Sequence, residues 1–162
     1  MWRAQQRIHS RVAARLIASA PDESAVQSWL AQELRLRMQG VASIVREEEV
    51  HGRKRPDIRV HRPNIPGPIA IEIKIADRYS SLTAFKRALR TQLVGQYMRD
   101  QRSHYGVLVL VFTDRRSNWR SDTQSLNAAD LLKALQSEAE RVRAERPGIS
   151  GLDVCSIRGA PA

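Results

Sequence analysis

The chain has 162 residues, of which 42% are hydrophobic and 27% charged, so it is long enough for one domain with a real core, and wholesale disorder is excluded. Lys and Arg outnumber Asp and Glu by 27 to 17, and the net charge of +10 favours a polyanionic partner, with nucleic acid ahead of an anionic membrane surface. The single Cys155 excludes an internal disulfide and fits a cytoplasmic protein, and no apolar run is long enough to span a bilayer.

Two helices are predicted at the N-terminal end. Residues 2–19 have helical spacing, with one apolar stripe and, on another face, a row of arginines at four-residue steps: Arg3, Arg7, Arg11 and Arg15. This row suits phosphates or an acidic partner, and a solvated helix face is the alternative. After Pro21, residues 22–39 form a second predicted helix, and Glu33 lies beside its packing stripe.

Strands then alternate with helices along the rest of the chain. We predict strands over 41–50, 57–62, 68–76, 105–112 and 151–158, and helices over 82–101 and 127–146. Ser80 or Ser81 is expected to cap the first of these helices and Asn127 the second, and residues 114–126 read as a polar loop. The order predicts one α/β domain over 1–162. It has an extra basic helix at 1–20, a core at 22–125 and a final helix and strand at 126–158.

The strand at 68–76 carries two charges in an otherwise apolar run. Strand alternation puts Glu72 and Lys74 on one face and the isoleucines on the other. If this strand pairs with 57–62 as an antiparallel hairpin, the shared isoleucine core brings Asp57 to the same side as Glu72 and Lys74. Either these charges solvate an exposed face of the sheet, or they form a site.

Two carboxylates held close repel each other unless a cation lies between them or one takes up a proton. Oxygen ligands of this kind are what Mg²⁺ prefers, and a nearby lysine can stabilise charge that develops on a phosphate oxygen. The face with Asp57, Glu72 and Lys74 therefore suits hydrolysis of a phosphodiester.

The pattern Pro56-Asp57, followed fifteen residues later by Glu72-Ile73-Lys74, resembles the PD-(D/E)xK nuclease superfamily. The family core is a helix, three strands, a helix and a strand, and residues 22–112 offer that order. The resemblance thus implies a restriction-endonuclease-like α/β fold, a mixed central sheet flanked by helices. Residues 1–20 and those after about 125 lie outside it.

The resemblance also implies roles for individual residues. Asp57 and Glu72 would be metal ligands together with the Ile73 carbonyl, and Lys74 would be the catalytic lysine. Some branches of the family carry a glutamine on the following helix, for which Gln92 and Gln96 are the candidates. An extra acid often comes from the first core helix, and Glu33 is the candidate, with Glu48 as a competitor.

The loop at 114–126 combines arginines with a tryptophan. Such a segment can follow a nucleic-acid backbone and stack on a base. The residues predicted to do so are Arg115, Arg116, Trp119 and Arg120. Alternatively, Trp119 pins the loop to the body of the fold.

Taken with the charge, the resemblance implies a Mg²⁺-dependent nuclease, with Mn²⁺ as a substitute, that cuts DNA; RNA is the weaker option. It leaves open whether the chain acts as a homodimer or within a longer multi-domain protein. Related domains serve restriction, repair, junction resolution and bacterial defence. The alternatives are a nucleic-acid-binding module without activity on the same fold, and a basic protein-interaction domain.

Overall fold

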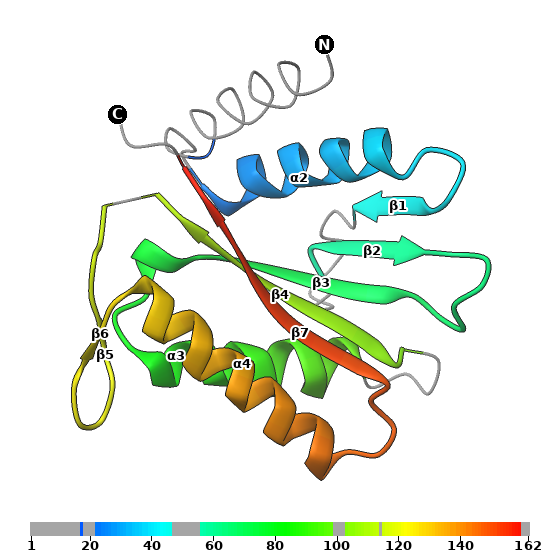
Figure 1. Ribbon diagram of the computed structural model, residues 1–162. Coiled ribbons are helices and arrows are strands. Elements are labelled where there is room, and N and C mark those ends of the chain that lie inside the picture. Colours follow the sequence, from blue (N-terminus) through cyan, green and yellow to red (C-terminus); the bar gives the residue numbers. More distant parts are fainter. Residues whose placement is uncertain (1–16, 18–21, 47–55, 99–102, 114, 160–162) are drawn as a thin grey trace.

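The computed structural model describes residues 17, 22–46, 56–98, 103–113 and 115–159. Five strands form one sheet in the order β1-β2-β3-β4-β7 (Figure 1). They are β1 (Ser43–Arg46), β2 (Ile58–His61), β3 (Ile69–Ile75), β4 (Tyr105–Phe112) and β7 (Gly151–Arg158). The pairs β1–β2 and β2–β3 are antiparallel, whereas β3–β4 and β4–β7 are parallel. The predicted mixed sheet and the antiparallel hairpin across residues 62–68 are therefore confirmed.

Helices cover both faces of the sheet (Figure 1). Helix α2 (Glu23–Arg37) lies on one face. The other face carries α3 (Leu82–Arg87), the π-helix η2 (Ala88–Tyr97) and α4 (Ala128–Glu145). These three lie in the connections β3-to-β4 and β4-to-β7, and right-handed crossovers between successive parallel strands place both connections on the same face. Among the described residues, no helix combines the length and apolar character needed to cross a membrane.

The alternation of β3 divides the core in two. Ile71 and Ile73 pack with Ile58 and Val60 beneath α2, whereas Ala70 packs with the helices on the opposite face. Glu72 and Lys74 share the face of Ala70, since successive strand residues point to opposite sides. The two charges therefore point into the half of the core that α3, η2 and α4 cover.

Side chains cap the helices where the sequence predicts it. Ser81 accepts a hydrogen bond from the Ala84 N–H, and Asn127 accepts from the N–H groups of Ala129 and Asp130. Asp22 caps α2 in the same way through the Ala25 N–H. These caps fix where each helix begins relative to the strand before it.

The predicted helix over 82–101 is not a single α-helix, because the chain changes from α to π geometry at Ala88. A Cβ on Gly95 would lie 3.0 Å from the Arg90 carbonyl oxygen, a tight contact, so a glycine fits this turn of the π-helix without displacing that carbonyl. π-Helical segments are rare and frequent at functional sites. Here the segment carries Gln92, Gln96 and Tyr97.

Two contacts hold η2 in place. A Cβ on Gly106 of β4 would lie 2.6 Å from the Met98 sulfur, so glycine permits the close approach of this segment to the sheet. On the opposite side, Arg90 donates to Glu138 of α4 at 2.5 Å and to Glu145 at 2.8 Å. Glu138 is only 3% exposed. Because a buried acid that loses its partners is costly, this network ties η2 firmly to α4.

The segment predicted as a polar loop contains a small hairpin, β5 (Trp119–Arg120) paired with β6 (Ser125–Leu126). The base-stacking prediction for Trp119 is wrong. Its side chain is 1% exposed, packs edge-on against Phe112, and donates from Nε1 to the Ala76 carbonyl at 3.0 Å. Trp119 therefore pins the hairpin to the core, as the alternative interpretation held.

Replacing Trp119 with phenylalanine should lower the free energy of unfolding by roughly 1–3 kcal/mol, because the buried indole N–H bond to the Ala76 carbonyl is lost and the smaller ring fills less of the core, although the Tyr79 N–H still donates to that carbonyl. DNA affinity should stay unchanged, since the ring does not reach the surface. Urea unfolding together with fluorescence anisotropy on a labelled duplex checks both. A large loss of affinity in a fully folded variant would contradict the buried role.

Candidate active site

The candidate site lies where β3 extends beyond the end of its pairing with β2. The antiparallel ladder ends with Ile58 opposite Ile71, whereas β3 continues to Ile75. Beyond the ladder, the Ile73 N–H donates to Asp57 Oδ2 at 2.7 Å, and the Ile75 N–H donates to Glu23 Oε1 at 3.4 Å. Two carboxylates thus take the place of a paired strand on this edge. The N–H and C=O of a strand residue face the same neighbour, so the Ile73 carbonyl also points to this edge.

Asp57 is placed by the residues around the start of β2. Continuing the ladder by one residue puts Asp57 opposite Glu72. Its Oδ1 accepts from Gln27 Nε2 of α2 at 2.6 Å, and its Oδ2 accepts from Ile73. Burial, followed by the negative charge of Glu72, raises the pKa of Asp57 to about 7.

Glu72 and Lys74 form a buried ion pair. Their residues are 2% and 7% exposed, so the alternative in which they solvate an open sheet face is wrong. Lys74 Nζ lies 2.5 Å from Glu72 Oε1. Burial opposes the charge on Lys74, but Glu72 outweighs it, and the pKa of Lys74 is raised. The ammonium therefore stays charged at neutral pH.

The pKa of Glu72 is also raised, because its burial outweighs the effect of Lys74. The hydroxyl of Tyr97, at the end of η2, lies near this carboxylate, and burial with the charge of Glu72 raises the pKa of Tyr97. Tyr97 therefore remains a donor at physiological pH. With Asp57 nearby, the site concentrates negative charge that protein groups compensate only in part.

Unpaired polar atoms gather on the same face. The described residues contain four buried side-chain oxygens with no hydrogen-bond partner, and three of them belong to residues singled out from the sequence: Glu72 Oε2, Gln92 Oε1 and Gln96 Oε1. Buried acceptors of this kind are uncommon in folded proteins. Gln92 and Gln96 lie on η2, which also brings Tyr97 to Glu72. These oxygens could accept hydrogen bonds from a ligand or bind a cation.

The acid that α2 brings to the site is Glu23 and not the predicted Glu33. Glu33 lies ten residues beyond Glu23, about 15 Å along the helix, and its carboxylate binds Arg37 at 3.1 Å. Glu23, in the first turn of α2, instead reaches β3, and its charge contributes to the raised pKa of Asp57 and of Glu72. Glu23 is thus the acid from α2 that the structure brings to the site. The competitor Glu48 lies outside the described residues.

Two further groups were missed from the sequence. Gln27 and Tyr97 have no distinctive spacing relative to Asp57 and Glu72, and only the fold brings Gln27 to Asp57 and Tyr97 to Glu72. The position of Tyr97 next to Gln96, on a helix already singled out, was the one signal that could have identified it.

The arginines predicted to bind nucleic acid fall into two groups, of which the structure describes one. Arg115, Arg116 and Arg120 are exposed around the β5–β6 hairpin, as a nucleic-acid contact requires. Arg116 also donates to the Asp77 carbonyl at 3.3 Å. The predicted row Arg3, Arg7, Arg11 and Arg15 lies outside the described residues.

For a metal ion, the described residues offer no group of three or more His, Cys, Asp or Glu side chains in ligand geometry. The oxygen donors that are present are the carboxylates of Asp57 and Glu72, whose pKa values are raised, and the Ile73 carbonyl on the open strand edge. One carboxylate oxygen, Glu72 Oε2, has no hydrogen-bond partner. These are hard oxygen donors of the kind Mg²⁺ prefers, and Mg²⁺ commonly takes only one or two carboxylates from the protein.

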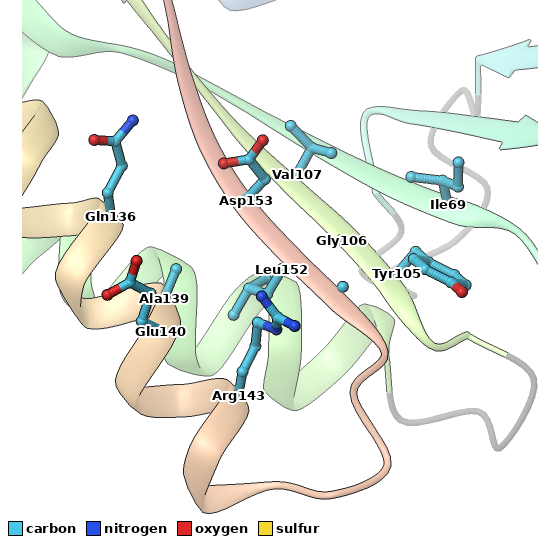
Figure 2. Close-up of a pocket in the computed structure, with 11 residues that line it drawn as sticks. Ile69, Tyr105, Gly106, Val107, Gln136, Ala139, Glu140, Arg143, Leu152 and Asp153 are labelled. Carbon is cyan, nitrogen blue, oxygen red and sulfur yellow. The ribbon is translucent and has the colours of Figure 1, made fainter.

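A larger cavity, of about 550 Å³, lies at the opposite end of the strands, where β4 and β7 begin (Figure 2). It runs along β7, whose outer edge has no strand partner in the described sheet. Side chains from both sides cap Val154 there: Asp153 accepts from its N–H at 2.8 Å, and Gln136 donates to its carbonyl at 3.1 Å. The charged residues that line it, Glu140, Arg143 and Asp153, are exposed, so we assign the chemistry to the buried, polar site around Glu72.

No protein-family model, curated protein or solved structure matches the chain at a significant level.

Proposed function

We propose that this protein is a metal-dependent nuclease of the PD-(D/E)xK superfamily, with a restriction-endonuclease-like fold, that hydrolyses phosphodiester bonds in DNA. The observation that carries the proposal is the convergence of Asp57, Glu72 and Lys74 at the open edge of β3, with Glu72 Oε2 left without a partner. A merely structural ion pair would not need a second carboxylate whose pKa is raised to about 7.

Asp57, Glu72 and the Ile73 carbonyl would hold the metal. Bound Mg²⁺ would polarise the phosphate and lower the pKa of an attacking water. Lys74 would donate to the phosphate oxygen on which charge develops, and its raised pKa keeps it ready to do so. Gln92 and Gln96 would orient the phosphate or the water through their amide groups. The net charge of +10 supports a polyanionic substrate.

The direct test is a cleavage assay on supercoiled, linear, branched and single-stranded DNA, with RNA as a comparison. We expect nicking or cutting with Mg²⁺ or Mn²⁺ and complete loss with excess chelator. Equal activity in chelator would exclude the metal. Tight DNA binding with no cleavage of any form in Mn²⁺ would favour the non-catalytic binding module, and binding to neither nucleic acid would favour the protein-interaction domain.

The exposed arginines should appear in the salt dependence of DNA binding. Each phosphate contact contributes about 0.9 to the slope of log K against log salt on duplex DNA. Replacing Arg115, Arg116 and Arg120 together with glutamine should flatten that slope and weaken all sequences alike. Anisotropy titrations between 50 and 200 mM salt, roughly the range in which such contacts dominate, measure it. Arg37→Gln, on α2, is the control, and an unchanged slope in the triple variant would assign these arginines to plain solvation.

A further inference from the structure

A second cavity, of about 140 Å³, lies at the carboxyl-terminal ends of β3 and β4. These strands are parallel, with Ile75 beside Val111, so their ends open at the same edge of the sheet. The cavity is lined by Ile75, Asp77, Arg78, Thr113 and Arg115. Its volume corresponds to roughly four or five water molecules at liquid density. A base or a sugar ring would fit there, whereas a whole nucleotide would not.

Asp77 gives this cavity an asymmetric polar wall. Its Oδ2 accepts from the Thr113 N–H at 2.8 Å and from the Thr113 hydroxyl, which ties the short helix η1 (Ala76–Arg78) to the end of β4. Its Oδ1 is buried and has no hydrogen-bond partner among the described residues. A buried acceptor without a partner is unfavourable by roughly 1–3 kcal/mol, so the wall fits a ligand that brings a hydrogen-bond donor.

The rim of the cavity has the opposite character. Arg78 and Arg115 both line the cavity and are exposed to solvent. A suitable ligand therefore carries a donor at its inner end and negative charge at its outer end. Inorganic phosphate carries its charge and its P–OH donor on one small group, so it cannot place a donor at the inner end and negative charge at the rim at the same time. A nucleotide can, because its sugar hydroxyl or base amine is separated from its phosphate.

The cavity also lies close to the candidate active site. Asp77 follows Lys74 by three residues on the same segment, within about 10 Å at the rise of a strand. We infer that this cavity binds the nucleoside part of a nucleotide next to the cleaved phosphodiester, with a sugar hydroxyl or base amine donating to Asp77 and the phosphate meeting Arg115 and Arg78. The choice of a nucleic-acid strand rests on the proposed function.

The test uses the full chain in excess chelator, so that binding is measured without cleavage. Calorimetric or NMR titrations compare deoxycytidine monophosphate with inorganic phosphate, thymidine monophosphate, which lacks an exocyclic amine, and a dideoxycytidine monophosphate, which lacks the 3′-hydroxyl. We expect the nucleotide to bind at least about tenfold more tightly than phosphate, and one of the two analogues to lose most of that gain. That analogue identifies the donor. Equal binding of all four ligands would overturn the inference.

Asp77→Asn provides the matched variant. The new amide can still accept from Thr113 but presents N–H groups where the ligand needs an acceptor. Nucleotide affinity should fall about tenfold, while phosphate affinity should hold or rise because a negative charge has gone. Arg115→Gln should weaken both ligands, and Arg37→Gln neither. Unchanged nucleotide affinity in Asp77→Asn, or an equal loss for both ligands, would refute the role of Asp77.

This test and the cleavage assay fail independently. A chain that binds nucleotides through Asp77 but cuts no DNA would remove the proposed function and leave the cavity assigned. A chain that cuts DNA but binds nucleotides no better than phosphate would do the reverse. The ligand series on the unmodified protein also stands if Asp77→Asn fails to fold.

Discussion

Replacing Lys74 with alanine should lower the rate of DNA cleavage by at least about a hundredfold. Lys74 Nζ is held 2.5 Å from Glu72 in a site with little access to water, and prepositioned donors in such sites are worth roughly 10²–10³ in rate. Because the substitution removes a positive charge next to two carboxylates, Mg²⁺ should bind as well as before or more tightly. Single-turnover cleavage at saturating Mg²⁺ separates the two effects.

Lys86→Ala is the matched control. Lys86 also pairs with a buried acid, Glu138, at 3.5 Å, but its side chain is 36% exposed and Glu138 keeps Arg90 as a partner. This variant should cut DNA at the rate of the unmodified protein. If Lys74→Ala does the same, the assignment of Lys74 as the catalytic lysine is wrong.

Lys74→Ala should also be less stable than the unmodified protein in the absence of metal. Removing Lys74 leaves Glu72 buried without its cation and close to Asp57, and breaking a buried pair on one side commonly destabilises a protein by about 3–5 kcal/mol. Protonation of a carboxylate will reduce this loss, and Mg²⁺ should restore much of the remainder. Thermal melts over a Mg²⁺ titration should therefore show a larger metal-induced gain for Lys74→Ala than for the unmodified protein.

Asp57→Asn should stabilise the metal-free protein at pH 8 and have little effect at pH 4. The pKa of Asp57 is about 7 in the folded protein, above its ordinary value of 3.8. Because the folded state binds this proton more tightly, the proton contributes stability that is fully present below about pH 4 and is lost as the pH rises through about 7. The difference of about three units corresponds to at most about 4 kcal/mol at 1.36 kcal/mol per unit. Asparagine does not titrate, so the variant should lack this part of the pH dependence.

Asparagine can keep the local hydrogen bonds. Its oxygen can accept from the Ile73 N–H, and its amide can donate to Gln27 if that side chain turns its oxygen toward it. Urea unfolding from pH 4 to pH 8 in chelator tests the pH dependence, with Glu33→Gln as a control that should follow the unmodified protein. Greater stability of the unmodified protein at pH 8 would mean that Asp57 is stabilising as a charged group.

Mg²⁺ should reverse the order of stability. A ligand that binds only the folded state stabilises it by RT ln(1 + [L]/Kd), about 2.7 kcal/mol at a hundredfold excess over Kd. The unmodified protein should gain this amount, whereas Asp57→Asn and Glu72→Gln should lose most of the gain together with cleavage. No metal effect on any of the three would leave the carboxylates without a metal role.

The sequence was sufficient to predict that Asp57, Glu72 and Lys74 lie close together, but not to predict the whole site. The alternation in β2 and β3 predicted that Asp57, Glu72 and Lys74 share one side, because a strand has a fixed period of two. It could not predict that β2 begins late enough to leave Ile73 and Ile75 unpaired on one edge, since strand ends depend on tertiary contacts.

Residues on helices were harder to place. Glu33 matched an expected acid on the first core helix, but only the start of α2, set by the Asp22 cap, decides which end of the helix meets β3. Similarly, the change to π geometry at Ala88 depends on packing against β4 and α4, and helical periodicity alone did not predict it. The burial of Trp119 depends on the carbonyl of Ala76, 43 residues away.

The side-chain caps on β7 bear on how the protein behaves at high concentration. A bare edge strand is a template for adding strands from other molecules, and Asp153 and Gln136 occupy both backbone groups of Val154 at its centre. Asp153 also places a charge there, which discourages close approach of a second chain. Their loss would free both backbone groups of Val154 for pairing with a strand from another molecule. Two side chains that belong to no catalytic group thus protect this part of the edge.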